Sequence, residues 1–308
     1  MNSKGEHSLP IETLLEANRW GVFPYPGEDD ASFYRRLDYL LSKKGHAIIP
    51  EGIEEIYHLG DFPEAQAAVE SLYGISPDWV PIFFSNRALT FLHGGCTWFV
   101  PVGDGVTVPV IQLKQRLQTQ KSILLGLYTR TEILVHELTH AARTGFDSRY
   151  EELLAYRSSE HVIRRWIAAG TEIWEGIACL LLLAFWFFLP FTGLRAPLVF
   201  IHPLIPLWII SYFILATALR AWGKIHTINR AHQTLKALFT PSIDSSQKTT
   251  TSPDARAWAL LFRLSDLEIE QFARWSSASI VAYCKAASSE DLRWHILYTE
   301  YFKGNNQL

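Results

Sequence analysis

The chain has 308 residues, of which 48% are hydrophobic, and its formal net charge is −3. This length and apolar content are enough to bury a sizeable core and suggest about two domains. The charge is mildly negative and no basic stripe with interleaved aromatic residues occurs, so we expect no nucleic-acid partner. Three cysteines without a C-x-x-C pair imply neither a disulfide framework nor a thiolate zinc site, which is typical of a reducing compartment.

Residues 1–160 predict a mixed domain that begins with helices. Apolar residues recur with helical spacing at 11–20, 31–44 and 63–73. Gly74 follows the third of these segments, where a glycine commonly ends a helix. The first part of the domain is therefore predicted to be helical.

Strands are predicted next. Residues 78–84 are aromatic and apolar, and residues 98–102 and 106–113 flank a Gly-Asp-Gly turn, which is typical of a β-hairpin. Pro101 and Pro109 lack the amide proton that a ladder needs, which favours edge positions for both. Together with the helices, these strands indicate an α+β fold that is mainly helical and contains a small antiparallel sheet.

The segment TEILVHELTHAAR, residues 131–143, is predicted to lie on one helix. Thr129, followed three residues later by Glu132, matches a capping box at the start of a helix. Gly145 stands just beyond the last apolar position, where a left-handed glycine would end it. We therefore expect a single helix over residues 130–144.

On this helix, His136, Glu137 and His140 have the spacing H-E-x-x-H. Side chains four residues apart share one face, so the two imidazoles can bind one metal ion while Glu137 faces a water molecule on that ion. The alternative is a pair of ordinary histidines on a structural helix. Catalytic zinc takes three protein ligands and leaves the fourth position to water, so the hypothesis of a metal site requires a third ligand nearby.

The segment SRYEELLAY supplies that ligand. Ser148 with Glu151 three residues later matches another capping box, which would occupy Glu151 and leave Glu152 free. A helix beginning at Ser148 after a short turn would run antiparallel to the first and bring Glu152 to the two histidines. The alternatives for the third ligand are Glu151, Glu160 and His161.

Residues 129–160 resemble the gluzincin metallopeptidases, in which two histidines of H-E-x-x-H and a glutamate on a following helix hold zinc. Membrane-embedded members often carry that glutamate as E-x-x-A-D, and ELLAY is similar, with Ala155 in register and Tyr156 in place of the aspartate. The resemblance implies a metallopeptidase-like domain with Zn²⁺ as cofactor, a peptide or protein substrate, and Glu137 as the base that takes a proton from water and passes it to the leaving amine. Candidates for second-shell contacts or for stabilising the oxyanion are Tyr156 and Arg143, with Tyr128, Tyr150 and Arg149 as further candidates for the oxyanion.

Residues 161–227 are predicted to form a transmembrane hairpin. Two uncharged apolar runs predict spans at about 173–191 and 198–219, joined by the short segment TGLR. Basic residues precede the first span and follow the second, whereas the turn carries Arg195 alone. By the positive-inside rule, both soluble parts are expected on the cytoplasmic side of a lipid bilayer. The alternative is a buried helical hairpin in a soluble core.

Residues 228–308 are predicted to be a linker followed by a small helical module. The linker TPSIDSSQKTTTSPD has no periodicity, and Ser265 with Glu268 matches a capping box at the start of a later helix. The layout of a soluble part with a short-turned hairpin also resembles the inclusion membrane proteins of chlamydiae. Two functions follow: a membrane-anchored zinc peptidase, or a catalytically silent membrane-inserted scaffold or secreted effector that binds protein partners.

Overall fold

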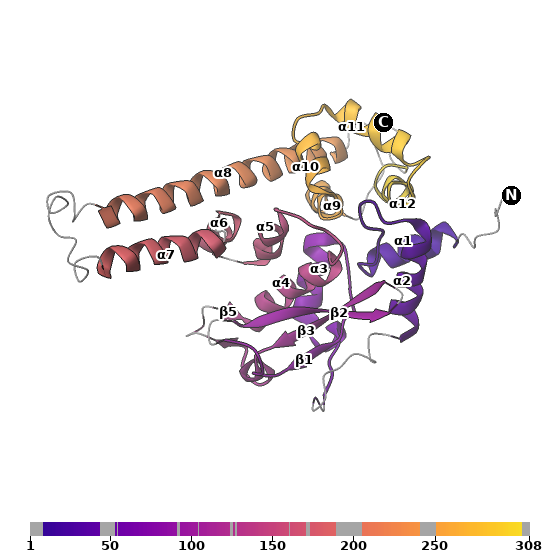
Figure 1. The fold of residues 1–308 in the computed structure, drawn as a ribbon. Helices are drawn as coiled ribbons and strands as arrows, with labels where there is room; N and C mark the ends of the chain where they lie inside the picture. Colours follow the sequence, from indigo (N-terminus) through magenta and orange to yellow (C-terminus); the bar gives the residue numbers. More distant parts are fainter. Residues whose placement is uncertain are drawn as a thin grey trace.

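The computed structural model describes residues 9–43, 53, 55–90, 93–103, 105–123, 126, 128–159, 161–170, 173–188, 205–240 and 251–303. Its first part contains α1 (Ile11–Arg19), α2 (Asp30–Lys43), α3 (Pro63–Tyr73), β1 (Ile82–Phe84), β2 (Gly95–Gly103), β3 (Val106–Leu113), β4 (Ser122–Ile123) and β5 (Tyr128–Thr129). Next come α4 (Arg130–Ala142), α5 (Glu151–Ala155), the 3₁₀ turn η4 (Tyr156–Ser158), α6 (Val162–Gly170), α7 (Ile173–Phe188) and α8 (Ile205–Phe239). The last helices are α9 (Pro253–Leu261), α10 (Asp266–Phe272), α11 (Ser277–Ala287) and α12 (Leu292–Tyr301). The fold is α+β and mainly helical, as predicted (Figure 1).

The main sheet has three strands in the order β1-β3-β2. β2 and β3 form the predicted antiparallel hairpin, with Trp98 opposite Val110. The prediction of an antiparallel sheet is wrong for β1, which runs parallel to β3 with Ile82 opposite Ile111. An apolar sequence pattern identifies a strand but carries no information on its direction beside a strand that is not its hairpin partner.

Pro109 lies in the central strand β3 rather than in an edge strand, which corrects the prediction for this residue. It is opposite Phe99 of β2. The pairing of β1 covers only Ile111 to Leu113 of β3. Pro109 therefore lies outside the stretch in which β3 is paired on both sides, where a missing amide proton would interrupt the ladder.

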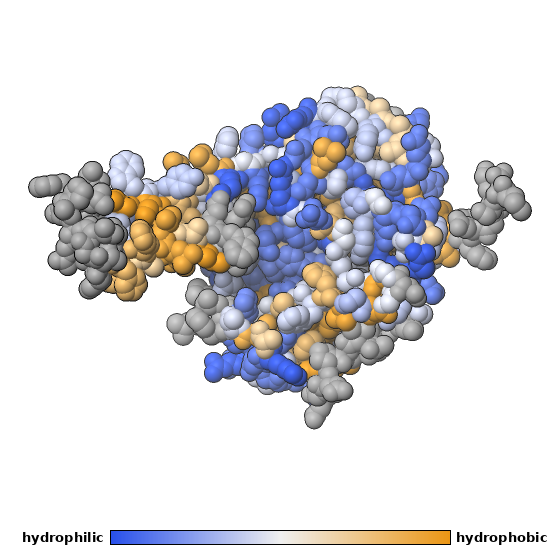
Figure 2. Space-filling view, in the orientation of Figure 1, coloured by the Kyte–Doolittle hydropathy of each residue, from blue (hydrophilic) through white to orange (hydrophobic). Residues whose placement is uncertain are grey.

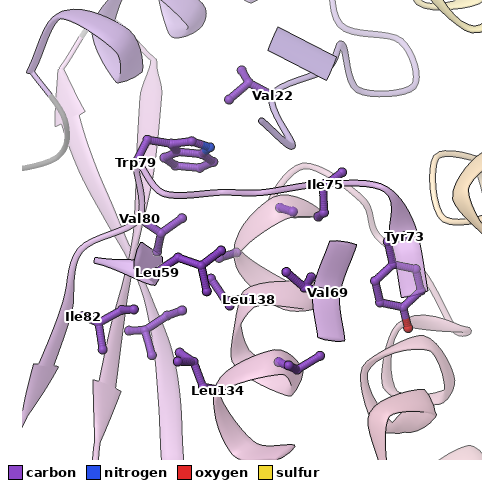
Figure 3. Packing of buried hydrophobic residues seen from close by; sticks show 14 of the residues in the cluster. Val22, Leu59, Val69, Tyr73, Ile75, Trp79, Val80, Ile82, Leu134 and Leu138 are labelled. Atoms are coloured by element: carbon purple, nitrogen blue, oxygen red, sulfur yellow. The ribbon is translucent and has the colours of Figure 1, made fainter. Parts of the chain in front are cut away.

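Helix α4 packs between this sheet and α3. Leu134 and Leu138 are fully buried in one cluster with Val69 of α3 and Ile82 of β1 (Figure 3). Full burial of two leucines on one helix contributes roughly 1.5–3 kcal/mol each. This packing fixes the rotation of α4 about its axis, and with it the direction of the polar side chains on the rest of the helix.

The start of α4 is capped as predicted, in part. The hydroxyl of Thr129 accepts a hydrogen bond from the amide of Glu132 at 3.1 Å. The carboxylate of Glu132 takes a different partner from the one predicted and accepts a hydrogen bond from Nη1 of Arg164 at 3.1 Å. The cap is therefore one-sided, and Glu132 ties α4 to α6.

The end of α4 differs from the prediction. The helix ends at Ala142 with Arg143 as its C-cap, and the backbone of Gly145 is not left-handed. A Cβ atom at Gly145 would instead lie 1.9 Å from Cδ2 of Tyr25. The position requires glycine because an aromatic ring packs on the backbone, which sequence spacing cannot reveal.

We expect Gly145→Ala to lower the free energy of unfolding by about 1–3 kcal/mol, because the added methyl group must displace the Tyr25 ring. Thermal unfolding followed by circular dichroism measures the effect. Gly223→Ala in α8 is the matched control, since a Cβ there meets no atom within 4 Å and alanine favours a helix. Equal melting temperatures for Gly145→Ala and the wild type would contradict the close packing of Tyr25.

A second hydrophobic cluster joins α5 to the distal half of α8 and to the C-terminal helices. Its buried residues include Leu153, Leu154, Ile228, Leu235, Leu260 and Phe272. Helix α8 is continuous across residue 227, where the sequence suggested a boundary between a hairpin and a C-terminal module. That boundary therefore lies inside a helix and does not separate two packed units.

The C-terminal helices also pack against the N-terminal part. The buried guanidinium of Arg263 donates from Nε to Oδ1 of Asn18 at 2.6 Å and from Nη1 to the carbonyl of Tyr73 at 2.9 Å. The predicted capping box of Ser265 and Glu268 is present at the start of α10. The described helices after residue 250 are thus the predicted ones, but they share a core with the first 160 residues, and most of the predicted linker, residues 241–250, lies outside the described part of the chain.

Helices α7 and α8 project side by side from the rest of the molecule (Figure 1). Helix α8 is long and apolar enough to cross a membrane, and the apolar part of α7, Gly176–Phe188, is shorter. Their large apolar side chains are exposed and give the projection its hydrophobic surface (Figure 2). Among the described residues one helix therefore qualifies as a span, and the predicted turn with Arg195 lies outside them.

Candidate metal centre

The two histidines of α4 and Glu152 of α5 lie together. The Nε2 atoms of His136 and His140 are 3.2 Å apart. The carboxylate of Glu152 has Oε1 at 3.5 Å from Nε2 of His140 and Oε2 at 3.8 Å from Nε2 of His136. One donor atom from each of the three residues lies within 4.8 Å of the other two, so the structure brings the three predicted ligands together.

The geometry and chemistry of this set fit a zinc ion. Tetrahedral zinc binds nitrogen at about 2.0–2.1 Å and carboxylate oxygen at about 2.0–2.2 Å, which places neighbouring donor atoms roughly 3.3–3.5 Å apart. The histidine nitrogens are already 3.2 Å apart, whereas one donor atom of Glu152 lies within 4.8 Å of both, so the half-exposed side chain of Glu152 must turn toward them to bring one oxygen to this distance. Two imidazoles and one carboxylate also leave a fourth position open, as catalytic zinc sites do.

Burial and charge affect the two histidines differently. Burial, followed by the neighbouring imidazole of His140, lowers the pKa of His136 to about 3. Burial also disfavours a charged His140, but contacts with the carboxylates of Glu151, Glu152 and Glu137 outweigh it and raise the pKa of this side chain. His136 is therefore in the neutral form in which imidazole binds a metal.

The predicted helix cap at Ser148 is wrong. Helix α5 begins at Glu151, its N-cap is Tyr150, and no side chain caps it. The hydroxyl of Ser148 donates instead to Oδ1 of Asp266 at 2.6 Å. A partner 118 residues away in the sequence competes successfully for this hydroxyl, which local spacing cannot predict.

Glu151 contacts His140 at Nδ1, the ring nitrogen that does not face His136 and Glu152. Its Oε1 atom lies 3.3 Å from Nδ1 of His140, and its Oε2 atom accepts a hydrogen bond from Nε of Arg143 at 2.7 Å. A carboxylate on the second nitrogen of a metal-binding histidine orients the ring and fixes its tautomer. Glu151 thus makes the contact with the second nitrogen of a histidine for which Tyr156 was one candidate.

Arg143 does not line the pocket, so of its two predicted roles the structure favours a contact behind the ligands, through Glu151, over stabilising an oxyanion. Its side chain is 0% exposed, donates to the carbonyl of Phe262 and lies over the ring of Phe146 at 4.2 Å. Its part in the site is indirect, since it holds the carboxylate of Glu151. Through Phe262 it also connects the site to the C-terminal helices.

Glu137 lies beside the ligands and contacts the sheet. Its side chain accepts a hydrogen bond on Oε2 from the hydroxyl of Thr97 in β2 at 2.8 Å. Burial raises the pKa of this carboxyl, while His140 and the Thr97 hydrogen bond act in the opposite direction. Thr97 therefore holds the carboxylate in one orientation at the edge of β2.

A pocket of about 160 Å³ opens beside Glu137 and His136. Its walls come from β2, β5, α4 and η4, and the lining residues are His93, Gly94, Gly95, Tyr128, Glu132, Ile133, His136, Glu137, Tyr156 and Ser158. A Cβ atom at Gly94 would lie 2.4 Å from Cδ1 of Ile133, so the backbone itself packs on α4 at this wall. The pocket opens on the side of α4 that carries His136 and Glu137.

Two of the five predicted oxyanion candidates line the pocket, Tyr128 and Tyr156. The ring of Tyr156 meets that of His136 edge to face at 4.4 Å, and burial followed by the charge of Glu152 raises its pKa to about 12. Tyr150 is buried in the second cluster, and Arg149 forms ion pairs with Asp266 and Glu270. Tyr156 is therefore a neutral hydrogen-bond donor next to the ligands.

Sequence reasoning missed the roles of Thr97 and Glu151 and the position of His93. No local signal marks Thr97, because it meets Glu137 across 40 residues. His93 lines the pocket, and its Nδ1 atom is 2.8 Å from the hydroxyl of Thr90. Of the other third-ligand candidates, His161 is exposed and outside the ligand group, and Glu160 lies outside the described residues.

Comparison of the chain with models of protein families, with curated proteins and with solved structures gives no match. The functional conclusion therefore depends on the H-E-x-x-H segment and on the geometry around it.

Proposed function

We propose that the protein is a membrane-anchored, zinc-dependent peptidase. The convergence of His136, His140 and Glu152, with donor atoms within 4.8 Å of one another, carries this proposal. Zinc held by these residues would polarise the scissile carbonyl and lower the pKa of a water molecule toward neutrality. The reaction class is hydrolysis of a peptide bond in a peptide or protein substrate that enters the pocket beside α4.

The chain's own residues supply the proton transfers. Glu137 is adjacent to both histidines and lines the pocket, so its carboxylate can take the proton of the attacking water and deliver it to the leaving amine. The hydrogen bond from Thr97 keeps one of its oxygens engaged and its orientation fixed. Tyr156 can donate its phenolic proton in a hydrogen bond to the oxyanion that forms from the carbonyl.

Zinc analysis of the purified full-length chain, combined with a cleavage assay on an unstructured protein such as casein, tests the proposal. We expect about one zinc per chain, hydrolysis that a chelator stops, and recovery when zinc is returned. Protein that holds zinc but cleaves none of a broad set of peptides would favour the membrane-inserted scaffold or secreted effector. If the protein bound no zinc, the site would be neither a catalytic nor a catalytically silent zinc site.

We also propose that α7 and α8 form a two-span hairpin. Helix α7 alone, with 16 residues, is about 24 Å long, which is shorter than the roughly 30 Å hydrocarbon core. A full first span therefore requires the apolar residues that follow Phe188 in the sequence. Basic residues flank the hairpin at its base, namely Arg157, Arg164 and Arg165 before it and Arg220, Lys224, Arg230 and Lys236 after it. This distribution supports a cytoplasmic position for both soluble parts.

Both termini are then expected on the same, cytoplasmic side of the membrane. Epitope tags at the two ends, in sealed cells or vesicles, should be equally protected from a protease applied on the outer side. Permeabilised membranes, in which both tags are digested, provide the control. Digestion of one tag alone in sealed membranes would contradict a hairpin with an even number of spans.

A further inference from the structure

A second pocket, also of about 160 Å³, lies at the base of the apolar projection. It is bounded by α5, η4, α6, α8 and α9, and its lining includes Arg157, Arg165, Trp166, Asn229 and Trp258. The volume is several times the roughly 30 Å³ that a water molecule takes up in the liquid, so it has room for a phosphate group. The neighbouring residues Tyr156 and Arg157 line different pockets, which places this one apart from the metal centre.

The two arginines of the pocket have unused hydrogen-bonding capacity. The Nε atoms of Arg157 and Arg165 are both buried and, within the described part of the chain, neither has a hydrogen-bond partner. The guanidinium of Arg157 lies 3.5 Å above the ring of Trp258, and burial lowers its pKa, as does the charge of Arg165. The two guanidinium groups repel each other and have lost part of their hydration. Binding of an anion between them would relieve both costs.

Asp254 is the carboxylate whose charge raises the pKa of Arg157, and it already has other partners. Asp254 accepts a hydrogen bond from Nζ of Lys236 at 2.7 Å and lies 3.5 Å from Nε2 of His232. In the part of the chain that the structure describes, no carboxylate forms an ion pair with Arg157 or Arg165 within 4.0 Å. Among the described residues, the two guanidinium groups of the pocket therefore have no carboxylate in ion-pair contact, although the charge of Asp254 raises the pKa of Arg157.

The pocket lies at the level where a membrane surface would be. On α8 the exposed apolar side chains end at Trp222, and the pocket begins at Ile225, about 4.5 Å further along the helix axis. On α6, Val162 and Ile163 are 59% and 74% exposed although they are apolar. The pocket is basic, has an apolar face beside it, and lies about one helical turn from the end of the apolar projection. These features suit the headgroup layer of a bilayer.

We propose that the pocket between α6 and α8 binds a phosphate group through Arg157 and Arg165, and that an anionic phospholipid of the surrounding membrane supplies it. Guanidinium groups bind phosphate through paired N–H donors, and Trp166 can contact the glycerol region beside it. The choice of a lipid as the source rests on the membrane insertion proposed above and does not depend on peptidase activity.

Calorimetric titration of the full-length protein in a neutral detergent tests this inference. The probes are short-chain phosphatidic acid, short-chain phosphatidylcholine and inorganic phosphate. Phosphatidic acid is expected to bind saturably and at least about tenfold more tightly than either of the others, because it combines the anionic group with apolar chains. Equal binding of inorganic phosphate would overturn the lipid as the source, and no saturable binding of any anion would overturn the site.

Arg165→Gln is the deciding variant, and it should weaken binding of phosphatidic acid by about tenfold or more. Arg157→Lys, which keeps the charge but loses the planar fork, should weaken it less. Arg230→Gln is the matched control, since Arg230 follows the pocket residue Asn229 but does not line the pocket. Equal losses in Arg165→Gln and Arg230→Gln would show a general charge effect and overturn the assignment. Unchanged zinc content in all three variants separates this result from damage to the metal centre.

Discussion

The Glu137→Gln variant is expected to hydrolyse peptide substrates at least about a hundredfold more slowly than the wild type, and to keep its fold and its zinc. The amide that replaces the carboxylate can neither take a proton from water nor deliver one to the leaving amine. It can still accept the hydrogen bond from Thr97, so the side chain should keep its place beside the pocket. Initial rates of peptide cleavage, measured at equal zinc loading, give the effect.

A control on the neighbouring helix α3 separates loss of the base from a change in charge. Glu64 is exposed and contacts α4 from outside the pocket, through the hydroxyl of Thr131. Glu64→Gln makes the same chemical change and should leave the cleavage rate close to that of the wild type. If Glu137→Gln cleaved as fast as Glu64→Gln, the proposed mechanism would have to be abandoned even if the chain binds zinc.

The Glu152→Ala variant is expected to lose most of its zinc, whereas Glu151→Gln should keep zinc with about 10–100-fold lower affinity. Glu152 provides the carboxylate that reaches the Nε2 atoms of both histidines. Glu151 instead faces Nδ1 of His140 and the guanidinium of Arg143. Removal of a ligand should therefore lower the zinc affinity more than removal of the group that orients a ligand.

Competition with a chromophoric chelator measures zinc affinity in both variants. Glutamine is used at position 151 because its amide oxygen can still accept the hydrogen bond from Arg143, whose side chain is 0% exposed and would otherwise be buried without that partner. Circular dichroism confirms that both variants are folded. Full zinc binding in Glu152→Ala together with loss in Glu151→Gln would mean that Glu151 is the ligand and the centre must be redrawn.

The sequence alone identified the elements that depend on local chemistry. The helices around residues 11–20, 31–44 and 63–73 follow from apolar periodicity, and the left-handed glycine at position 74 from the conformational freedom of that residue. The hairpin of β2 and β3 follows from its turn. His136 and His140 lie on one face because four residues make about one helical turn, which any helix at this position would impose.

Tertiary structure decided every feature that depends on partners distant in the chain. The direction of β1, the loss of the Ser148 cap to Asp266, and the engagement of Glu151 by Arg143 each involve groups that local spacing does not bring together. The same holds for the shared core of the N-terminal and C-terminal helices. A side chain with several possible partners takes the one that the packed core presents, because a buried polar group without a partner costs about 1–3 kcal/mol. Local spacing specifies which groups can pair, and the packing of the whole chain selects the pairs that form.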